Sequence, residues 1–187
     1  RNSRDENNKI KNGEIPEEWE KPENKSKLAQ KDTDADWTKK NGERHFGYKD
    51  HVKCDADSKL ITNYSVTSAS VHDSQRCLVF IGQEDEVLYA DSAYSGKPIA
   101  LALPENCKNQ ICEKGYRNSP LTSEQKMNNR RKSRIRCRIE QIFGFMTGAM
   151  HGITIRSIGI TRAWMNIGIT NLVYNFCRYS YLKRASA

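Results

Sequence analysis

Apolar and polar residues alternate along two stretches near the middle of the chain. The first runs from Phe46 to Cys54, with Asp50 breaking its apolar face, and the second runs from Leu60 to Val66. Alternation with a period of two is typical of strands that bury one face. Residues 55–58, Asp-Ala-Asp-Ser, have the composition of a turn. The pattern therefore predicts a β-hairpin.

A further strand is predicted to end at Asp91. Val87, Leu88 and Tyr89 suit a buried strand, and small and polar residues follow Ala90. An acid at the carboxyl end of a strand lies where α/β sheets usually place their chemistry, although an aspartate there more often belongs to a turn or a helix cap. Helices are predicted at 74–80 and 98–106, with a short strand near 111–112. This order predicts an α/β fold, a mixed sheet with helices packed on it.

The last third of the chain is predicted to be helical. Thr122 and Gln125 form a capping box, and the helix that they begin runs towards Gly148. Its apolar stripe has helical spacing and comprises Ile135, Ile139, Ile142, Phe143 and Met146. A second helix opens near Thr161, and we expect its apolar side to pack on the domain through Met165, Ile169, Leu172, Val173 and Phe176.

Composition separates an N-terminal arm from the rest. Residues 1–36 are polar and contain few apolar side chains, which predicts a partly disordered arm, with a folded domain over 37–187. The six cysteines lack metal-ligand spacing and are expected to be reduced thiols of a cytoplasmic protein. The sequence contains no signal peptide and no apolar run long enough to span a bilayer.

The basic residues are concentrated at the C-terminal end. Residues 114–187 carry 14 Lys or Arg and only 2 Asp or Glu, whereas residues 1–36 carry 8 and 10. A generic solubilising surface mixes both signs, so this asymmetry favours contact with a polyanionic backbone and makes nucleic acid the expected partner.

One of those two acids, Glu140, lies in the most basic helix. Arg136 precedes it by one turn, and the simplest interpretation is an ion pair worth a few tenths of a kcal/mol. The alternative is a metal-binding carboxylate in a basic cleft, as two-metal cleavage of phosphodiesters requires. The separation of Asp91 and Glu140 in the sequence does not decide between them.

Several motifs occur in an informative order along the chain. They are Gly47-Tyr48-Lys49, Ser70-Val71-His72-Asp73-Ser74, Tyr89-Ala90-Asp91-Ser92-Ala93-Tyr94, Ile111-Cys112-Glu113-Lys114-Gly115-Tyr116-Arg117, Arg136-Cys137-Arg138-Ile139-Glu140-Gln141-Ile142-Phe143-Gly144 and Asn171-Leu172-Val173-Tyr174-Asn175. Together they resemble bacterial insertion-sequence DDE transposases, specifically the group named for insertion sequence five.

The resemblance implies a ribonuclease H-like catalytic domain over 37–187, with a mixed sheet flanked by helices and a helical C-terminal third. Asp91 matches the second catalytic aspartate, Glu140 the catalytic glutamate, and both would hold Mg²⁺. The implied reaction is metal-dependent cleavage at insertion-sequence ends and strand transfer, by a homo-oligomer on double-stranded DNA. Basic side chains of the same helix would contact phosphates, namely Arg130, Arg131, Arg134, Arg136 and Arg138.

The chain departs from the transposase pattern in two respects. A tyrosine and a lysine that flank the glutamate are replaced by Ser133 and Thr147. The first catalytic aspartate, at the end of a first strand, is expected upstream of Arg1. The acids at 32, 34 and 36 are poor substitutes because no hydrophobic strand precedes them. The alternative function is therefore a catalytically inactive, DNA-binding remnant of a truncated transposase.

Two further residues near these motifs carry expectations. His72 belongs to one of the motifs, but a local hydrogen bond at the start of the following helix is the favoured role. Tyr94 is the aromatic residue expected nearest to DNA.

Overall fold

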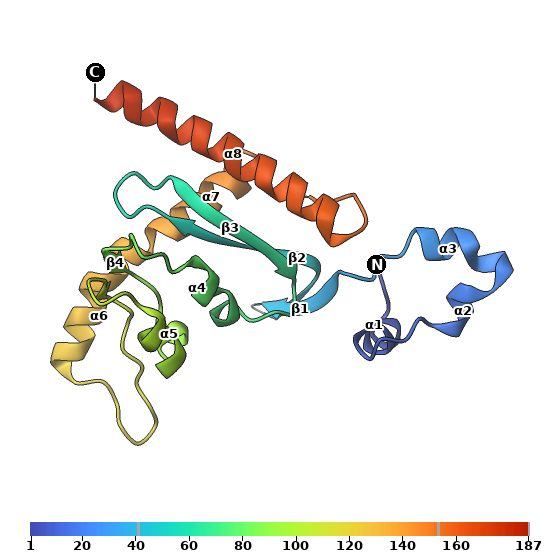
Figure 1. Cartoon of the computed structure of the whole chain (residues 1–187), viewed down its shortest axis with the longest axis horizontal. Coiled ribbons are helices and arrows are strands. Elements are labelled where there is room, and N and C mark those ends of the chain that lie inside the picture. The colour runs from blue at the N-terminus through green and yellow to red at the C-terminus, as the bar shows by residue number, and fades with distance from the viewer. Residues whose placement is uncertain (41, 153, 187) are drawn as a thin grey trace. The chain divides into compact units, whose positions relative to one another are not determined.

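The computed structural model describes residues 1–40, 42–152 and 154–186 (Figure 1). The chain divides into two compact units. Unit 1 comprises residues 1–51, 65–71 and 154–170, and unit 2 comprises residues 52–64, 72–153 and 171–187. Three elements run through both units: strands β2 (Glu43–Cys54) and β3 (Ile61–Ser68) and helix α8 (Ile160–Ala185).

Unit 1 begins with short helices where the sequence predicted a partly disordered arm. These are α1 (Arg4–Lys11), α2 (Glu17–Glu20), the 3-10 helix η1 (Pro22–Asn24) and α3 (Lys25–Ala29). Ser3 and Glu6 form a capping box at α1, and Trp19 is buried. Polar residues thus fold here because caps and a single aromatic anchor replace a large core. The boundary at residue 36 remains a prediction.

Glu6 is the polar centre of these helices. Its carboxylate accepts hydrogen bonds from the Trp19 indole at 2.9 Å and from Lys31 Nζ at 2.9 Å. Partial burial pushes the pKa of Glu6 upward, but the hydrogen bonds from Lys31, the Ser3 backbone and Trp19 outweigh it and hold the pKa at about 2. The folded state therefore favours the ionised carboxylate.

The substitution Glu6→Gln is expected to destabilise the protein by about 1 kcal/mol at pH 7, because glutamine can keep the capping bond from Ser3 but loses the charge and one of the two acceptor oxygens. A lowered pKa stabilises the fold above the unfolded value of 4.5, and this contribution is lost as the pH falls from 4.5 towards 2. Urea unfolding at several pH values measures the difference in unfolding free energy between the parent protein and Glu6→Gln. This difference should vanish near pH 2. An equal loss in Glu14→Gln, whose side chain is exposed, would contradict the assignment.

Strands β1 (Asp36–Lys40), β2 and β3 form one sheet in the order β1-β2-β3. β1 pairs with β2 in antiparallel register, with Asp36 opposite Gly47. At the turn between β2 and β3, the Asp55 amide donates to the Leu60 carbonyl at 2.9 Å, and Lys59 has a positive φ of 61°. The hairpin predicted from the alternating pattern is confirmed.

Unit 2 contains the strand that leads to Asp91. Its elements up to residue 109 are α4 (Ser74–Phe80), β4 (Val87–Leu88), the 3-10 helix η2 (Ser92–Tyr94), α5 (Lys97–Ala102) and β5 (Lys108–Asn109). Cys77, Ile99 and Ile111 form their core. β4 is shorter than the sequence suggested, and β5 lies at 108–109 rather than near 111–112. The two strands form a sheet of their own, separate from that of β1, β2 and β3, but the α/β order of elements holds.

The long helix predicted from Thr122 to Gly148 is interrupted, which corrects the expectation of one continuous element. Helix α6 (Ser123–Arg136) ends and α7 (Arg138–Gly148) begins around Cys137, whose ψ of −8° is far from the helical value. The capping box of Thr122 and Gln125 is present. The predicted apolar stripe is also confirmed, since Ile142 and Met146 are buried with Ile61 and Tyr174.

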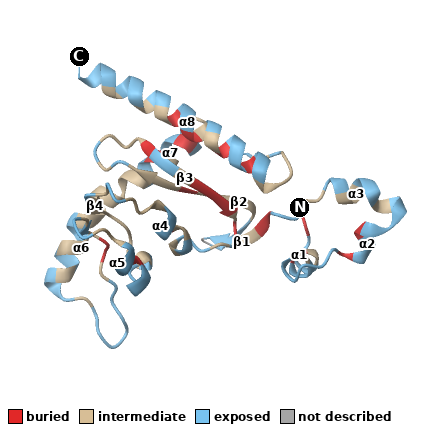
Figure 2. Cartoon of the chain, viewed as in Figure 1, coloured by how far each residue is buried: buried red, intermediate tan, exposed pale blue. Residues whose placement is uncertain are grey.

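Helix α8 packs through a different face from the one that we predicted. The buried residues are Ala163, Ile167, Asn171 and Tyr174, and the Asn175 side chain bonds both backbone groups of Ile61 at 2.8 Å. The predicted core residues Met165, Ile169, Leu172, Val173 and Phe176 are instead between 43% and 63% exposed (Figure 2). Among the described residues, no helix is long and apolar enough to cross a membrane.

Candidate active site

The parallel pairing of β4 with β5 places the residues that follow both strands at one edge. Val87 lies opposite Lys108. Backbone hydrogen bonds continue past the strands, from the Gln110 amide to the Leu88 carbonyl at 2.9 Å and from the Cys112 amide to the Ala90 carbonyl at 3.0 Å. Asp91 and Cys112 are therefore neighbours at the carboxyl ends of two parallel strands, where α/β sheets bind ligands.

Asp91 serves as a cap within this site. Its Oδ1 accepts a hydrogen bond from the Ala93 amide at 2.8 Å, at the start of η2. The hydrogen bond confirms the simple interpretation of Asp91 as a helix cap. It does not exclude a chemical role, because the carboxylate also lies on the wall of a pocket of about 500 Å³.

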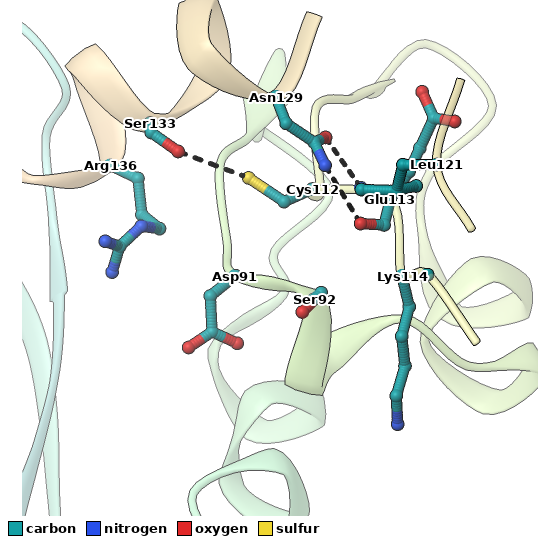
Figure 3. Close-up of a pocket in the computed structure, with 10 residues that line it drawn as sticks. Asp91, Ser92, Cys112, Glu113, Lys114, Leu121, Asn129, Ser133 and Arg136 are labelled. Atoms are coloured by element: carbon teal, nitrogen blue, oxygen red, sulfur yellow. Dashed lines mark hydrogen bonds between the residues drawn. The ribbon is translucent and has the colours of Figure 1, made fainter. Parts of the chain in front are cut away.

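Helix α6 is fastened to the segment after β5. Asn129 accepts from the Glu113 amide at 2.8 Å and donates to the Glu113 carbonyl at 2.9 Å. Lys132 Nζ donates to the Ile111 carbonyl at 2.9 Å, and Ser133 Oγ lies 3.8 Å from Cys112 Sγ. These contacts fix the register between the strand edge that carries Asp91 and the helix that ends at Arg136 (Figure 3).

Arg136 links the pocket to Glu140. Its guanidinium donates to Glu140 Oε1 at 2.7 Å, which confirms the predicted pair one helical turn apart. Arg136 also lines the pocket together with Asp91. In Figure 3 the Arg136 guanidinium and the Asp91 carboxylate lie on the same side of the pocket, whereas the Glu113 carboxylate points away from them. Asp91 and Arg136 thus line one pocket, and Glu140, which is not part of that lining, is paired with Arg136.

The other predicted arginines lie away from the pocket. Arg130, Arg131 and Arg134 are exposed on α6, on the side opposite Asn129 and Lys132. Arg138 opens α7 and donates to Asp57 at 3.3 Å. The basic helix thus divides into cations that hold the strand edge and cations that face solvent.

The remaining candidates have local roles. His72 Nδ1 lies 2.8 Å from Ser74 Oγ, which is the local hydrogen bond that we favoured. Tyr94 packs against the core of Cys77, Ile99 and Ile111, and burial, with the negative charges of Asp73 and Asp91, raises the pKa of its hydroxyl. Of the residues that replace the flanking tyrosine and lysine, Ser133 lines the pocket and Thr147 donates to the Phe143 carbonyl at 2.9 Å.

Sequence reasoning missed the clamp formed by Asn129 and Lys132. Lys132 is not among the predicted contacts, and Asn129 belongs to no recognised motif. The available signal was spacing, since Asn129, Ser133 and Arg136 recur at i, i+4 and i+7 and so share one face of a helix. That face lines the pocket.

Two carboxylates, those of Asp91 and Glu140, are the candidate metal ligands of the site. Asp91 and Glu140 supply the oxygen donors that Mg²⁺ prefers. Within residues 1–40, 42–152 and 154–186, however, no three His, Cys, Asp or Glu side chains gather as metal ligands. Two-metal cleavage uses several carboxylates, so the described residues alone do not fit such a centre.

A family model described as "Transposase DDE domain" matches residues 9–176. The chain therefore belongs to the DDE transposase family. Its 34% identity over 117 residues to the transposase for insertion sequence element IS1106 of Neisseria meningitidis serogroup B relates it to bacterial insertion sequences. That match covers 61% of this chain and 40% of the relative, so the chain spans less than half the length of this curated protein. No solved structure matches the chain.

Proposed function

We propose that this chain is part of the ribonuclease H-like catalytic domain of a transposase of the group named for insertion sequence five. The complete protein would cut phosphodiester bonds at the ends of its element and join them to target DNA. The observation that supports this best is a pocket lined by Asp91 and Arg136, with Arg136 bonded to Glu140, in a chain whose family match includes all three residues.

Asp91 and Glu140 are the proposed catalytic carboxylates. Magnesium as the cofactor rests on the family resemblance and on the oxygen chemistry of these two side chains. A complete two-metal site needs a further carboxylate beside these two. Arg136 would add a positive charge beside the phosphodiester, where charge develops during cleavage.

The outward face of α6 is the proposed contact with double-stranded DNA. Arg130, Arg131 and Arg134 are exposed there, and residues 123–139 contain a single acid, Glu124. Such side chains position a duplex through its phosphates and carry little sequence information. A homo-oligomer on the element ends follows from the same family resemblance.

The test is cleavage of a duplex that carries the element end by the complete transposase. We expect nicking in the presence of Mg²⁺ and its loss when EDTA removes the ion. Equal cleavage in EDTA would overturn the proposal of metal dependence. Binding of the duplex by the complete protein with no cleavage under any divalent cation would instead support a catalytically inactive, DNA-binding protein.

A further inference from the structure

The segment between β5 and α6 forms a loop whose two ends are held by one helix. At the first end, Asn129 of α6 bonds both backbone groups of Glu113 at 2.8 and 2.9 Å. At the second end, the Thr122 capping box begins α6 itself. We call the residues between them, 114–121, the rim loop. Figure 1 shows this segment projecting away from β4 just before α6.

The tip of the rim loop is a tight turn. The Tyr116 amide donates to the Ser119 carbonyl at 3.0 Å, and the Ser119 amide donates to the Tyr116 carbonyl at 3.1 Å. Gly115 closes the base, since a Cβ there would lie 3.2 Å from Leu121 Cγ. These contacts leave the loop few conformations, so a ligand that binds it has little ordering cost to overcome.

The rim loop presents one aromatic ring between two cations. Tyr116 is 63% exposed, and Lys114 Nζ lies 5.7 Å from the centre of its ring. Arg117 is exposed at the tip, and residues 114–122 contain no acid. A rigid aromatic face flanked by positive charge is the combination with which proteins bind single-stranded nucleic acid.

The position of the loop distinguishes Tyr116 from other exposed aromatic residues. Lys114, Gly115 and Leu121 line the same pocket as Asp91. Tyr116 follows Gly115 of that lining directly in the chain, although Tyr116 itself is not part of the lining. Tyr181 on α8 has a similar exposure of 57% and a cation, Arg178, 5.0 Å from its ring centre, but neither of its chain neighbours lines this pocket. Single exposed aromatic residues are common and need no explanation. Tyr116 differs from them because it adjoins the lining of the pocket that contains Asp91.

We propose that Tyr116 is a stacking site for an unpaired nucleobase next to the cleaved phosphodiester, with Lys114 and Arg117 contacting the flanking phosphates. This inference rests on the proposed function, because it requires DNA at Asp91. An unpaired base is the fitting ligand, since in a duplex both faces of a base are already covered by its neighbours. Stacking is tolerant of sequence, so Tyr116 contributes affinity rather than base recognition.

The experiment uses the complete transposase and a single-stranded oligonucleotide of the element end, with 2-aminopurine beside the cleavage position. Tyr116→Leu keeps an apolar side chain but removes the ring. It is expected to weaken binding about 5- to 100-fold and to abolish the quenching of 2-aminopurine fluorescence. Tyr116→Phe should bind within about twofold of the parent, because the stacking face is retained.

Tyr181→Leu is the matched control, because it removes an equally exposed ring from a different element. Unchanged affinity and quenching in Tyr116→Leu, or an equal loss in Tyr181→Leu, would overturn the stacking inference while cleavage by the parent protein left the proposed function standing. A parent protein that neither binds nor cleaves the element end would overturn both.

Discussion

Replacing Asp91 with asparagine is expected to lower the rate of DNA cleavage by the complete transposase about 10³-fold or more, or about 4 kcal/mol in activation free energy. The substitution removes the negative charge but not the hydrogen bond that Asp91 Oδ1 accepts from Ala93. Asparagine caps helix starts as well as aspartate does, so the local fold should be preserved. Loss of cleavage with an unchanged free energy of unfolding would therefore identify a chemical role for Asp91.

The measurement is single-turnover cleavage of the element end, with urea unfolding on the same preparations. Glu140→Gln should also lower the rate of cleavage, because it removes the second proposed carboxylate. Glu105→Gln, an exposed acid in the loop before β5, is the control and should cleave at the parental rate. Parental cleavage by Asp91→Asn would remove Asp91 from the catalytic site.

The second large effect is expected in the core that supports α7. Ile142 is fully buried and packs with Ile61, Met146 and Tyr174. Ile142→Ala removes apolar contacts and leaves a cavity, which should lower the unfolding free energy by about 2–5 kcal/mol.

Urea-induced unfolding followed by circular dichroism measures this loss. Met127→Ala on α6 is the control, because Met127 is 51% exposed and its truncation should change stability by no more than about 0.5 kcal/mol. Similar stabilities for the two variants would show that α7 does not depend on this cluster.

The elements that sequence predicted well are those with a local signal. The hairpin of β2 and β3 follows from a period of two, and the start of α6 from the Thr122 capping box. The stripe that includes Ile142 and Met146 follows from helical spacing. In each case the deciding residues lie within a few positions of one another.

Helix α8 shows where such reasoning fails. Apolar residues surround this helix, so the spacing of Met165 and Ile169 fits a core face as well as that of Ala163 and Ile167 does. Tertiary contacts choose between them, and the structure buries the second pair. A periodic pattern selects a face only when the opposite face is polar.

The candidate site was predictable in its carboxylates but not in its supports. Asp91 and Glu140 belong to recognisable motifs. By contrast, Asn129 bonds backbone groups 16 residues away in the sequence, and every residue type except proline can supply both a backbone N–H and a carbonyl. A contact to the backbone therefore leaves no recognisable residue pattern in the sequence at Glu113. The break at Cys137 was missed for a related reason, since no glycine or proline marks it.

Helix α6 anchors both ends of the rim loop. The position of Asp91 therefore does not depend on how many residues the tip of the loop contains. Closing a longer flexible loop costs only about 0.6 kcal/mol for each doubling of its length. Extra residues between Arg117 and Asn118 would leave the Asn129 clamp and the Thr122 cap in place. The tip is thus a tolerant insertion point, where evolution or protein engineering can exchange one segment for another without rebuilding the pocket beneath it.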